Sequence, residues 1–161
     1  MPGPELHPAL AELAPLLGRW EGAGRGWFPT IDDFDYTEVT TFGHAGKPFL
    51  ALTQATRSPE GAPLHAESGY LRAVGDGRLE LVMAHPFGAA ELAEGHAVRH
   101  GDHLRIELAT TAVVLTATAK EVTEVRRELV VDGDELRYRV AMAAVGRPLQ
   151  DHLEATLHRS R

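Results

Sequence analysis

The sequence predicts an all-β fold: an antiparallel up-and-down barrel of about ten strands with a short N-terminal helix. Apolar and polar residues alternate with a period of two along most of the chain, and turn residues separate these runs at short intervals. Only the N-terminal segment has helical spacing. Such a pattern suits an antiparallel barrel or a sandwich. The barrel is slightly favoured, because a long meander of short strands would leave unpaired edges and closure into a barrel removes them.

The composition is that of one globular domain spanning residues 1–161, with 43% hydrophobic and 24% charged residues. The formal charge of -7 argues against a nucleic-acid partner, because phosphates require a basic surface. The chain has no cysteine, which excludes disulfides, thiolate nucleophiles, cysteine-type zinc sites and iron–sulfur clusters. Any metal must therefore be held by His, Asp or Glu, or arrive within a cofactor, and nine histidines are available.

No segment of the sequence indicates export or a membrane. The N-terminus lacks the basic and apolar regions of a signal peptide, and no apolar run approaches the ~18–20 residues of a membrane-spanning helix. We therefore expect a cytoplasmic protein with no membrane partner.

The predicted helix covers about residues 7–14. Leu6, Leu10 and Leu13 form one apolar face at the spacing i, i+4, i+7. Pro8 suits a first helical turn, and Pro15 is expected to end the helix. The barrel should then occupy about residues 17–159.

The expected strands follow in sequence order, and two tight turns, 75–77 and 132–134, are typical of hairpins. The strand-like runs are 34–42, 48–56, 65–74, 78–85, 89–94, 103–109, 113–119, 124–131, 135–145 and 149–159. Ahead of them, glycines flank Trp20 between Gly18 and Gly24. Glycine in a strand allows a bend or the close approach of a bulky group, so we expect Trp20 to plug one end of the barrel.

Several polar clusters resemble functional sites, but each has a simpler explanation. His96, His100 and His103 have metal-like spacing, yet the neighbouring glycines place them in a polar hairpin. The acidic residues at 32, 33 and 35 fit a solvated loop, because catalytic carboxylate pairs are set in space rather than in sequence. His85 precedes a proline at a strand end, where a structural role is favoured.

The last strand has two distinct faces. Leu149, Leu153 and Leu157 share one face, whereas His152, Glu154, Thr156 and His158 share the other. The pattern alone does not say which face points inward, and it favours a solvent-facing His152.

Taken together, blocks along nearly the whole chain resemble the nitrobindin family of β-barrel haem proteins, which are similar in shape to fatty-acid-binding proteins and lipocalins. The blocks are GxWxGxG at 18–24, FPTI at 28–31, FDY at 34–36 with Glu38, GKPFL at 46–50, PLH at 63–65 with Glu67, GYLR at 69–72, AHP at 84–86, AKEV at 119–122, Met142, and GRPLQDHL at 146–153.

The resemblance implies one ferric haem b per chain near the open end of the barrel, with His152 as the proximal iron ligand. It also implies that Thr30 contacts the haem and that Lys120 contacts the haem or its propionates. The family's association with peroxynitrite and nitric oxide implies a haem-dependent peroxynitrite isomerase that forms nitrate, as a monomer or homodimer. Phe28 stands where many relatives have tyrosine, so a hydroxyl is missing there, although ring packing should survive.

Two other functions remain open at this point. The barrel could be a non-catalytic carrier or sensor of haem, nitric oxide or a lipophilic ligand, or an empty barrel that acts through surface contacts. A Soret band distinguishes the haem-binding functions from the empty barrel, and peroxynitrite decay distinguishes an enzyme from a carrier.

Overall fold

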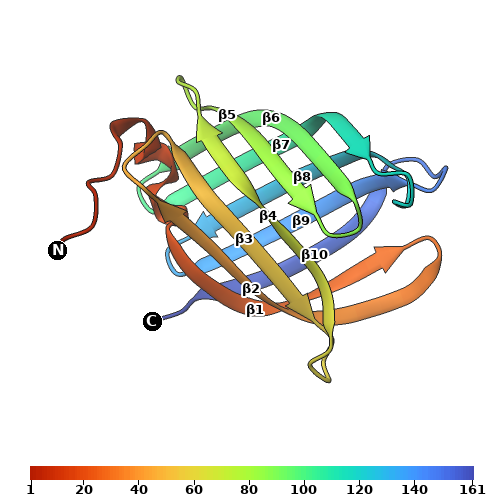
Figure 1. Ribbon diagram of the computed structural model, residues 1–161. Helices are drawn as coiled ribbons and strands as arrows, with labels where there is room; N and C mark the ends of the chain where they lie inside the picture. The colour runs from red at the N-terminus through yellow and green to blue at the C-terminus, as the bar shows by residue number, and fades with distance from the viewer.

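The computed structural model describes residues 1–161 and is a closed antiparallel barrel in which each strand pairs with its sequence neighbours and β1 pairs with β10 (Figure 1). The predicted fold class is confirmed. The strands are β1 (Gly18–Phe28), β2 (Ile31–His44), β3 (Phe49–Arg57), β4 (Pro63–Ala73), β5 (Arg78–His85), β6 (Ala89–His100), β7 (His103–Leu115), β8 (Val122–Asp132), β9 (Glu135–Ala144) and β10 (Gln150–Arg159).

The alternation of residues along each strand builds the core. On β7, Leu104, Ile106 and Leu108 are buried, while the intervening residues are exposed. The same period on β2 turns Glu38 and Thr40 inward, so the interior contains polar side chains as well as leucines. The barrel thus has an interior of mixed character, and its polar part lies toward one end.

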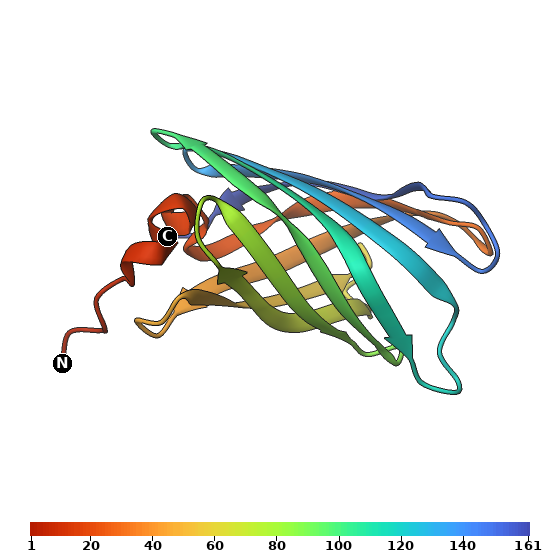
Figure 2. The ribbon, with the colours of Figure 1, turned by 90° about the horizontal axis from the view of Figure 1, so that it is seen from above.

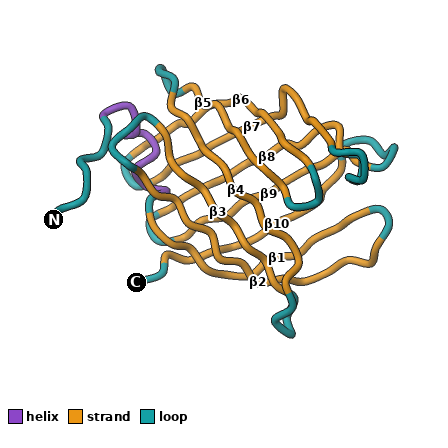
Figure 3. Tube along the Cα trace, viewed as in Figure 1, coloured by secondary structure: helices purple, strands orange, loops and turns teal.

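A 3-10 helix, η1 (Pro8–Leu16), lies across the other end of the barrel (Figures 2 and 3). Its buried leucines, Leu10, Leu13 and Leu16, are three residues apart, which matches three residues per turn. The expected end at Pro15 is wrong: the helix runs through this proline to Leu16, and the buried face uses Leu16 where the α-helical spacing predicted Leu6. No helix here has the length and apolar character needed to cross a membrane.

Trp20 on β1 completes this closed end. Its side chain is fully buried, and its indole N–H donates to the Leu16 carbonyl at 2.8 Å. The guanidinium of Arg159 lies 4.3 Å from the centre of the ring, within the range of a cation–π contact. The expected role of Trp20 as a plug is confirmed, and its polar N–H has a partner inside the core.

Several strand boundaries differ from the prediction; for example, β2 and β6 are longer than the predicted runs 34–42 and 89–94. Residues 113–119 were expected to form a separate strand, but residues 113–115 continue β7 and residues 116–119 lie outside any strand. The register of β6 and β7 shifts between Leu92 and Ala93, which leaves Thr111 unpaired and accounts for the broken alternation. The glycine-rich segment is itself a full strand, β1. Glycine is required at position 24, because a side chain there would overlap the Tyr36 ring and approach the Glu154 carbonyl to 2.6 Å.

Candidate functional site

A cavity of about 440 Å³ lies within the barrel at the end opposite η1. Its volume falls in the range of about 300–1,000 Å³ that is usual for small-molecule and cofactor pockets. Aromatic and aliphatic side chains form much of the wall, among them Phe28, Phe34, Leu64, Phe87, Met142 and Leu153. Charged and titratable groups complete it, so the cavity combines an apolar surface with a few polar groups.

His152 faces this cavity because of a β-bulge. Leu153 and Leu157 point inward, so strict alternation would turn His152 outward with Glu154. Asp151 pairs with Ala141 and Leu153 pairs with Val140, which leaves His152 as the extra residue of the strand. Both His152 and Leu153 therefore line the cavity, and the solvent-facing orientation favoured by the alternation is wrong.

The imidazole of His152 is held in one tautomer. Its Nδ1 lies 2.7 Å from the Trp27 carbonyl oxygen, which can only accept, so Nδ1 carries the proton. In the neutral ring this leaves the lone pair on Nε2. Burial lowers the pKa of His152, partly opposed by the bond to Trp27, and therefore favours this neutral form. The ring of Phe28 packs edge-on at 5.9 Å between centroids, so the expected ring packing at this position is present.

Lys120 and Thr30 are both exposed, but only Lys120 is part of the cavity wall. Lys120 lines the cavity from the segment before β8, and its Nζ is 5.0 Å from the centre of the Phe28 ring. Thr30 is exposed in the β1–β2 turn and is not part of the cavity wall, although its neighbours Phe28 and Ile31 are. The structure thus brings His152 and Lys120 to one cavity and leaves Thr30 at its rim.

A buried charged cluster forms another part of the wall. Arg127 on β8 donates two bonds to Glu91 on β6, at 2.6 and 2.8 Å, and approaches Glu67 on β4 to 3.4 Å. The Glu91 side chain is 1% exposed, and those of Arg127 and Glu67 are 10% and 13% exposed. Burial raises the pKa of Glu67, but the charge of Arg127, together with the contacts to His65 and His85, outweighs it and lowers the pKa to about 2. The cluster therefore holds fixed charges at neutral pH.

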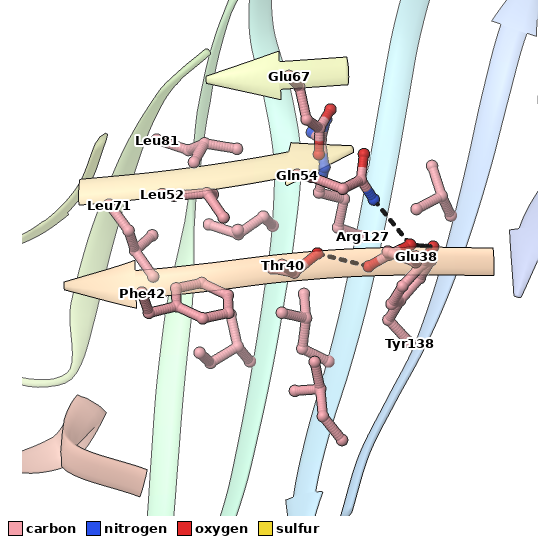
Figure 4. A pocket seen from close by; sticks show the side chains of 15 residues that line it. Glu38, Thr40, Phe42, Leu52, Gln54, Glu67, Leu71, Leu81, Arg127 and Tyr138 are labelled. Carbon is pink, nitrogen blue, oxygen red and sulfur yellow. Dashed lines mark hydrogen bonds and ion pairs between the residues drawn. The ribbon is translucent and has the colours of Figure 1, made fainter. Parts of the chain in front are cut away.

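A second polar network extends from the cavity toward the core, beside a void of about 60 Å³ (Figure 4). Glu38 accepts hydrogen bonds from Thr40 at 2.6 Å, Gln54 at 3.0 Å and the Tyr138 hydroxyl. Burial raises the pKa of Glu38 to about 7, against the opposing effect of Thr40 and Tyr138. The Oε1 atom of Gln54 is buried without a partner. The void has room for water there.

The metal-like histidines of the β6–β7 hairpin do not converge on a site. His100 and His103 are exposed cross-strand partners, and His96 pairs with Glu107. The acidic residues at 32, 33 and 35 lie on the β1–β2 hairpin, where exposed Asp33 approaches Arg25 to 3.7 Å. The predicted solvent exposure of both segments is confirmed, but the acidic residues lie on strand β2 and not in a loop.

Sequence reasoning missed the roles of Glu91 and Arg127 altogether, and it assigned His85 only to a strand end. His85 Nε2 lies 2.7 Å from Glu91, and its ring stacks on His65 with 5.5 Å between centroids. The usable signal was a charged residue at an inward position of an alternating strand, as at Glu91 among buried alanines. The pairing of strands far apart in sequence, which brings Arg127 to Glu91, has no such local signal.

The residues present fit a haem group. A neutral imidazole with its lone pair toward an apolar cavity is the donor that haem iron accepts, and the Trp27 carbonyl orients it from behind. The aromatic and aliphatic wall suits a porphyrin, and Lys120 provides a cation for a propionate.

Comparison with known proteins agrees with this fit. A family model described as "THAP4-like, heme-binding beta-barrel domain" matches residues 9–159. "Peroxynitrite isomerase 1" of Mycolicibacterium paratuberculosis (strain ATCC BAA-968 / K-10) is 56% identical over 158 residues, which cover 98% of each chain. "Peroxynitrite isomerase 1" of Mycobacterium tuberculosis (strain ATCC 25618 / H37Rv) is 52% identical over 161 residues, again covering 98% of each.

A solved structure shares the fold in detail. The crystal structure of Rv2717c from M. tuberculosis has a TM-score of 0.95 and 52% sequence identity, and the match covers 98% of this chain and 100% of that one. Barrel, cavity and sequence similarity lead to the same conclusion, in agreement with the resemblance to nitrobindins. The chain belongs to the family of THAP4-like, haem-binding β-barrel domains.

Proposed function

We propose that this chain binds one ferric haem b in the 440 Å³ cavity, with His152 as axial ligand, and isomerises peroxynitrite to nitrate. The observation that carries the proposal is the fixed His152 imidazole, whose Nδ1–H is bonded to Trp27 while Nε2 remains free within the cavity. The relatives named peroxynitrite isomerase cover 98% of this chain and support the reaction.

A bound haem, held by His152, would supply the Lewis-acid and redox chemistry for the conversion of peroxynitrite to nitrate. The protein supplies the ligand, the orientation and the surroundings. Because burial lowers the pKa of His152, its imidazole is neutral and ready to coordinate at physiological pH. Phe28 packs against the ring edge and restricts its rotation.

The remaining assignments concern the haem edge. We propose that Lys120 pairs with a propionate, because its ammonium lies in the cavity wall beside Phe28. We propose a weaker contact for Thr30, whose neighbours Phe28 and Ile31 line the cavity while its own side chain is exposed. Leu153, Met142 and the other apolar residues of the wall exclude water from the porphyrin faces.

Substitution of His152 tests the proposal directly. We expect haem titration of the wild type to give a Soret band at one equivalent and stopped-flow mixing to show rapid peroxynitrite decay by the ferric protein. His152→Ala should shift or abolish the Soret band and lose most of the decay rate. His158→Ala is the matched control, because this histidine lies on the same strand and is exposed. Unchanged spectra and rates in His152→Ala would exclude it as the axial ligand.

The same samples separate an enzyme from a carrier. A carrier would bind haem through His152 but give equal peroxynitrite decay in the wild type and in His152→Ala reconstituted to the same haem content. We also propose that nitric oxide binds the open axial position, that the protein is a monomer or homodimer, and that it is cytoplasmic. Spectral titration with nitric oxide, light scattering and cell fractionation test these three statements in turn.

A further inference from the structure

Three potential ligand atoms converge on one point of the cavity wall, apart from His152. His65 Nε2 and His85 Nδ1 are 3.4 Å apart, and Glu67 Oε2 lies 3.4 Å from the latter and 3.9 Å from the former. His65 and Glu67 share the inward face of β4, and His85 ends the adjacent strand β5. No other group of three such side chains approaches this closely anywhere in the molecule.

The separations match a metal site better than they match hydrogen bonds. A good hydrogen bond to nitrogen has a donor–acceptor distance of about 2.7–3.2 Å, shorter than all three contacts. A tetrahedral ion with bonds of about 2.0–2.2 Å keeps its ligand atoms about 3.3–3.6 Å apart. Two of the three separations fall in that range, and the third exceeds it by a few tenths of an ångström.

The groups behind the site prepare His85 to coordinate. His85 Nε2 lies 2.7 Å from Glu91, whose carboxylate can only accept, so Nε2 carries the proton. In the neutral ring the lone pair is then on Nδ1, which points toward Glu67 and His65. Arg127 fixes Glu91 with two bonds. A carboxylate that orients a ligand histidine in this way is a regular feature of metal sites.

The net charge of Glu67, Glu91 and Arg127 favours the binding of a cation. Glu67 in the wall and the buried Glu91 bring two negative charges, and Arg127 in the wall brings one positive charge, 3.4 Å from Glu67 Oε2. Glu91 takes both strong bonds of Arg127, so the guanidinium opposes a nearby dication less than an unpaired one would. Two carboxylates and one guanidinium leave one net negative charge in a buried site, and a bound metal cation would neutralise it.

We propose that His65, Glu67 and His85 form a binding site for one divalent first-row transition-metal ion such as Zn²⁺ or Fe²⁺. Two imidazoles and one carboxylate are the donors of catalytic zinc sites and of non-haem iron sites, and both leave coordination positions open. Here the open positions face the cavity, since all three residues line it. The ion occupies a site separate from the axial position of His152 and shares its cavity.

Binding of Co²⁺ to the full chain near neutral pH tests the site, because four-coordinate Co²⁺ absorbs visibly. We expect one equivalent to bind, with Zn²⁺ displacing it in a calorimetric titration. His65→Ala and Glu67→Gln should each weaken binding by more than about 100-fold, beyond the usual effect of losing an outer-shell partner. His65 is the most exposed ligand, with a side chain that is 33% accessible, so its variant should fold.

The exposed pair at the β6–β7 turn provides the matched control. His100→Ala should bind Co²⁺ as the wild type does, which excludes adventitious binding by surface imidazoles. The titration is made with the haem-free and the haem-loaded chain, and binding in either form that requires His65 and Glu67 supports the site. Absence of binding in both forms overturns the proposal, as does binding unchanged in His65→Ala. The Soret band of the same samples reports haem binding independently.

Discussion

The two ends of the barrel are built by different physics. At the closed end, Leu10, Leu13 and Leu16 of η1 pack with Trp20, and all four side chains are fully buried. At the open end, Glu67, Glu91 and Arg127 form a charged cluster beside a cavity of about 440 Å³. The closed end is stabilised by close packing, whereas the open end depends on the mutual neutralisation of buried charges.

This difference separates stability from function along one barrel. Apolar packing is nearly independent of pH and salt, so the closed end holds the strands in register under all conditions. The open end is less closely packed, because it contains a cavity and buried groups whose charge depends on pH. Substitutions at the two ends should therefore differ in how their effects on the free energy of unfolding depend on pH.

Arg127→Met should have the largest effect. It leaves Glu67 and Glu91 buried without their guanidinium partner, and breaking a buried ion pair costs about 3–5 kcal/mol. Arg127 is the largest of the influences that lower the pKa of Glu67 to about 2 despite burial, so its contribution is present above the ordinary value of 4.5 and is lost as the pH falls toward 2. Urea unfolding should show a loss near pH 7 that shrinks in acid. A loss of equal size at every pH would contradict the assignment to charge.

Trp20→Phe should be the next largest. It removes the indole N–H that bonds to Leu16 and leaves a void against η1, which together cost about 2–3 kcal/mol. Unfolding followed by circular dichroism should give the same loss at pH 5 and pH 8. Trp27→Phe is the control, because this indole is only partly buried, at the open end, and its carbonyl is retained. A strong pH dependence in Trp20→Phe would remove the contrast between the two ends.

Glu38→Gln should stabilise the protein in base. Burial raises the pKa of Glu38 from 4.5 to about 7, so within this window the folded chain holds a proton that the unfolded chain has released. The free energy of unfolding of the wild type therefore falls as the pH rises from 4.5 to 7. The variant should lack this decline and exceed the wild type by about 1–2 kcal/mol at pH 8. Parallel pH profiles of the two proteins would show that Glu38 ionises normally.

Lys120→Ala should weaken haem binding by about threefold, the worth of a partly exposed ion pair. The measurement is the haem dissociation constant from Soret titration at low salt, where such pairs are least screened. Lys47→Ala is a matched control, because Lys47 is the only other lysine and lies in the β2–β3 loop at the closed end. Equal effects of the two substitutions would point to net charge rather than to a contact.

Thr30→Ala should have the smallest effect, less than about twofold on the same dissociation constant, because an exposed hydroxyl competes with water for any partner. Folding should be unchanged. A tenfold weakening would mean that the β1–β2 turn closes over the haem and brings Thr30 into the cavity.

The period of two was sufficient to predict the strands, because alternation is a local property that the chain displays strand by strand. It left a barrel and a sandwich open, and strand closure and the family resemblance favoured the barrel. The position of the helix was predicted, but its type was not. Leu6, Leu10 and Leu13 fit an α-helical face, whereas the buried residues of the 3-10 helix are Leu10, Leu13 and Leu16. The two patterns overlap in two of three residues. Only the packing against Trp20 decides between them.

The site was less accessible to sequence reasoning for two physical reasons. The resemblance to a family pointed to His152, but alternation along β10 turns it outward, and a bulge cannot be seen in a pattern of side chains. The charged cluster joins β4, β6 and β8, and Arg127 and Glu91 are 36 residues apart. Such contacts depend on strand register, which one sequence does not reveal.

Because of the bulge, the orientation of the His152 imidazole depends on the number of residues in this part of β10. Because one unpaired residue separates the Asp151–Ala141 pair from the Leu153–Val140 pair, removal of a single residue there would restore strict alternation. Gln150 and Asp151 would exchange faces, while Leu157 and the core beyond would keep theirs. A change of one codon, with almost no change in composition, thus separates a barrel in which β10 presents His152 to the cavity from one in which it does not.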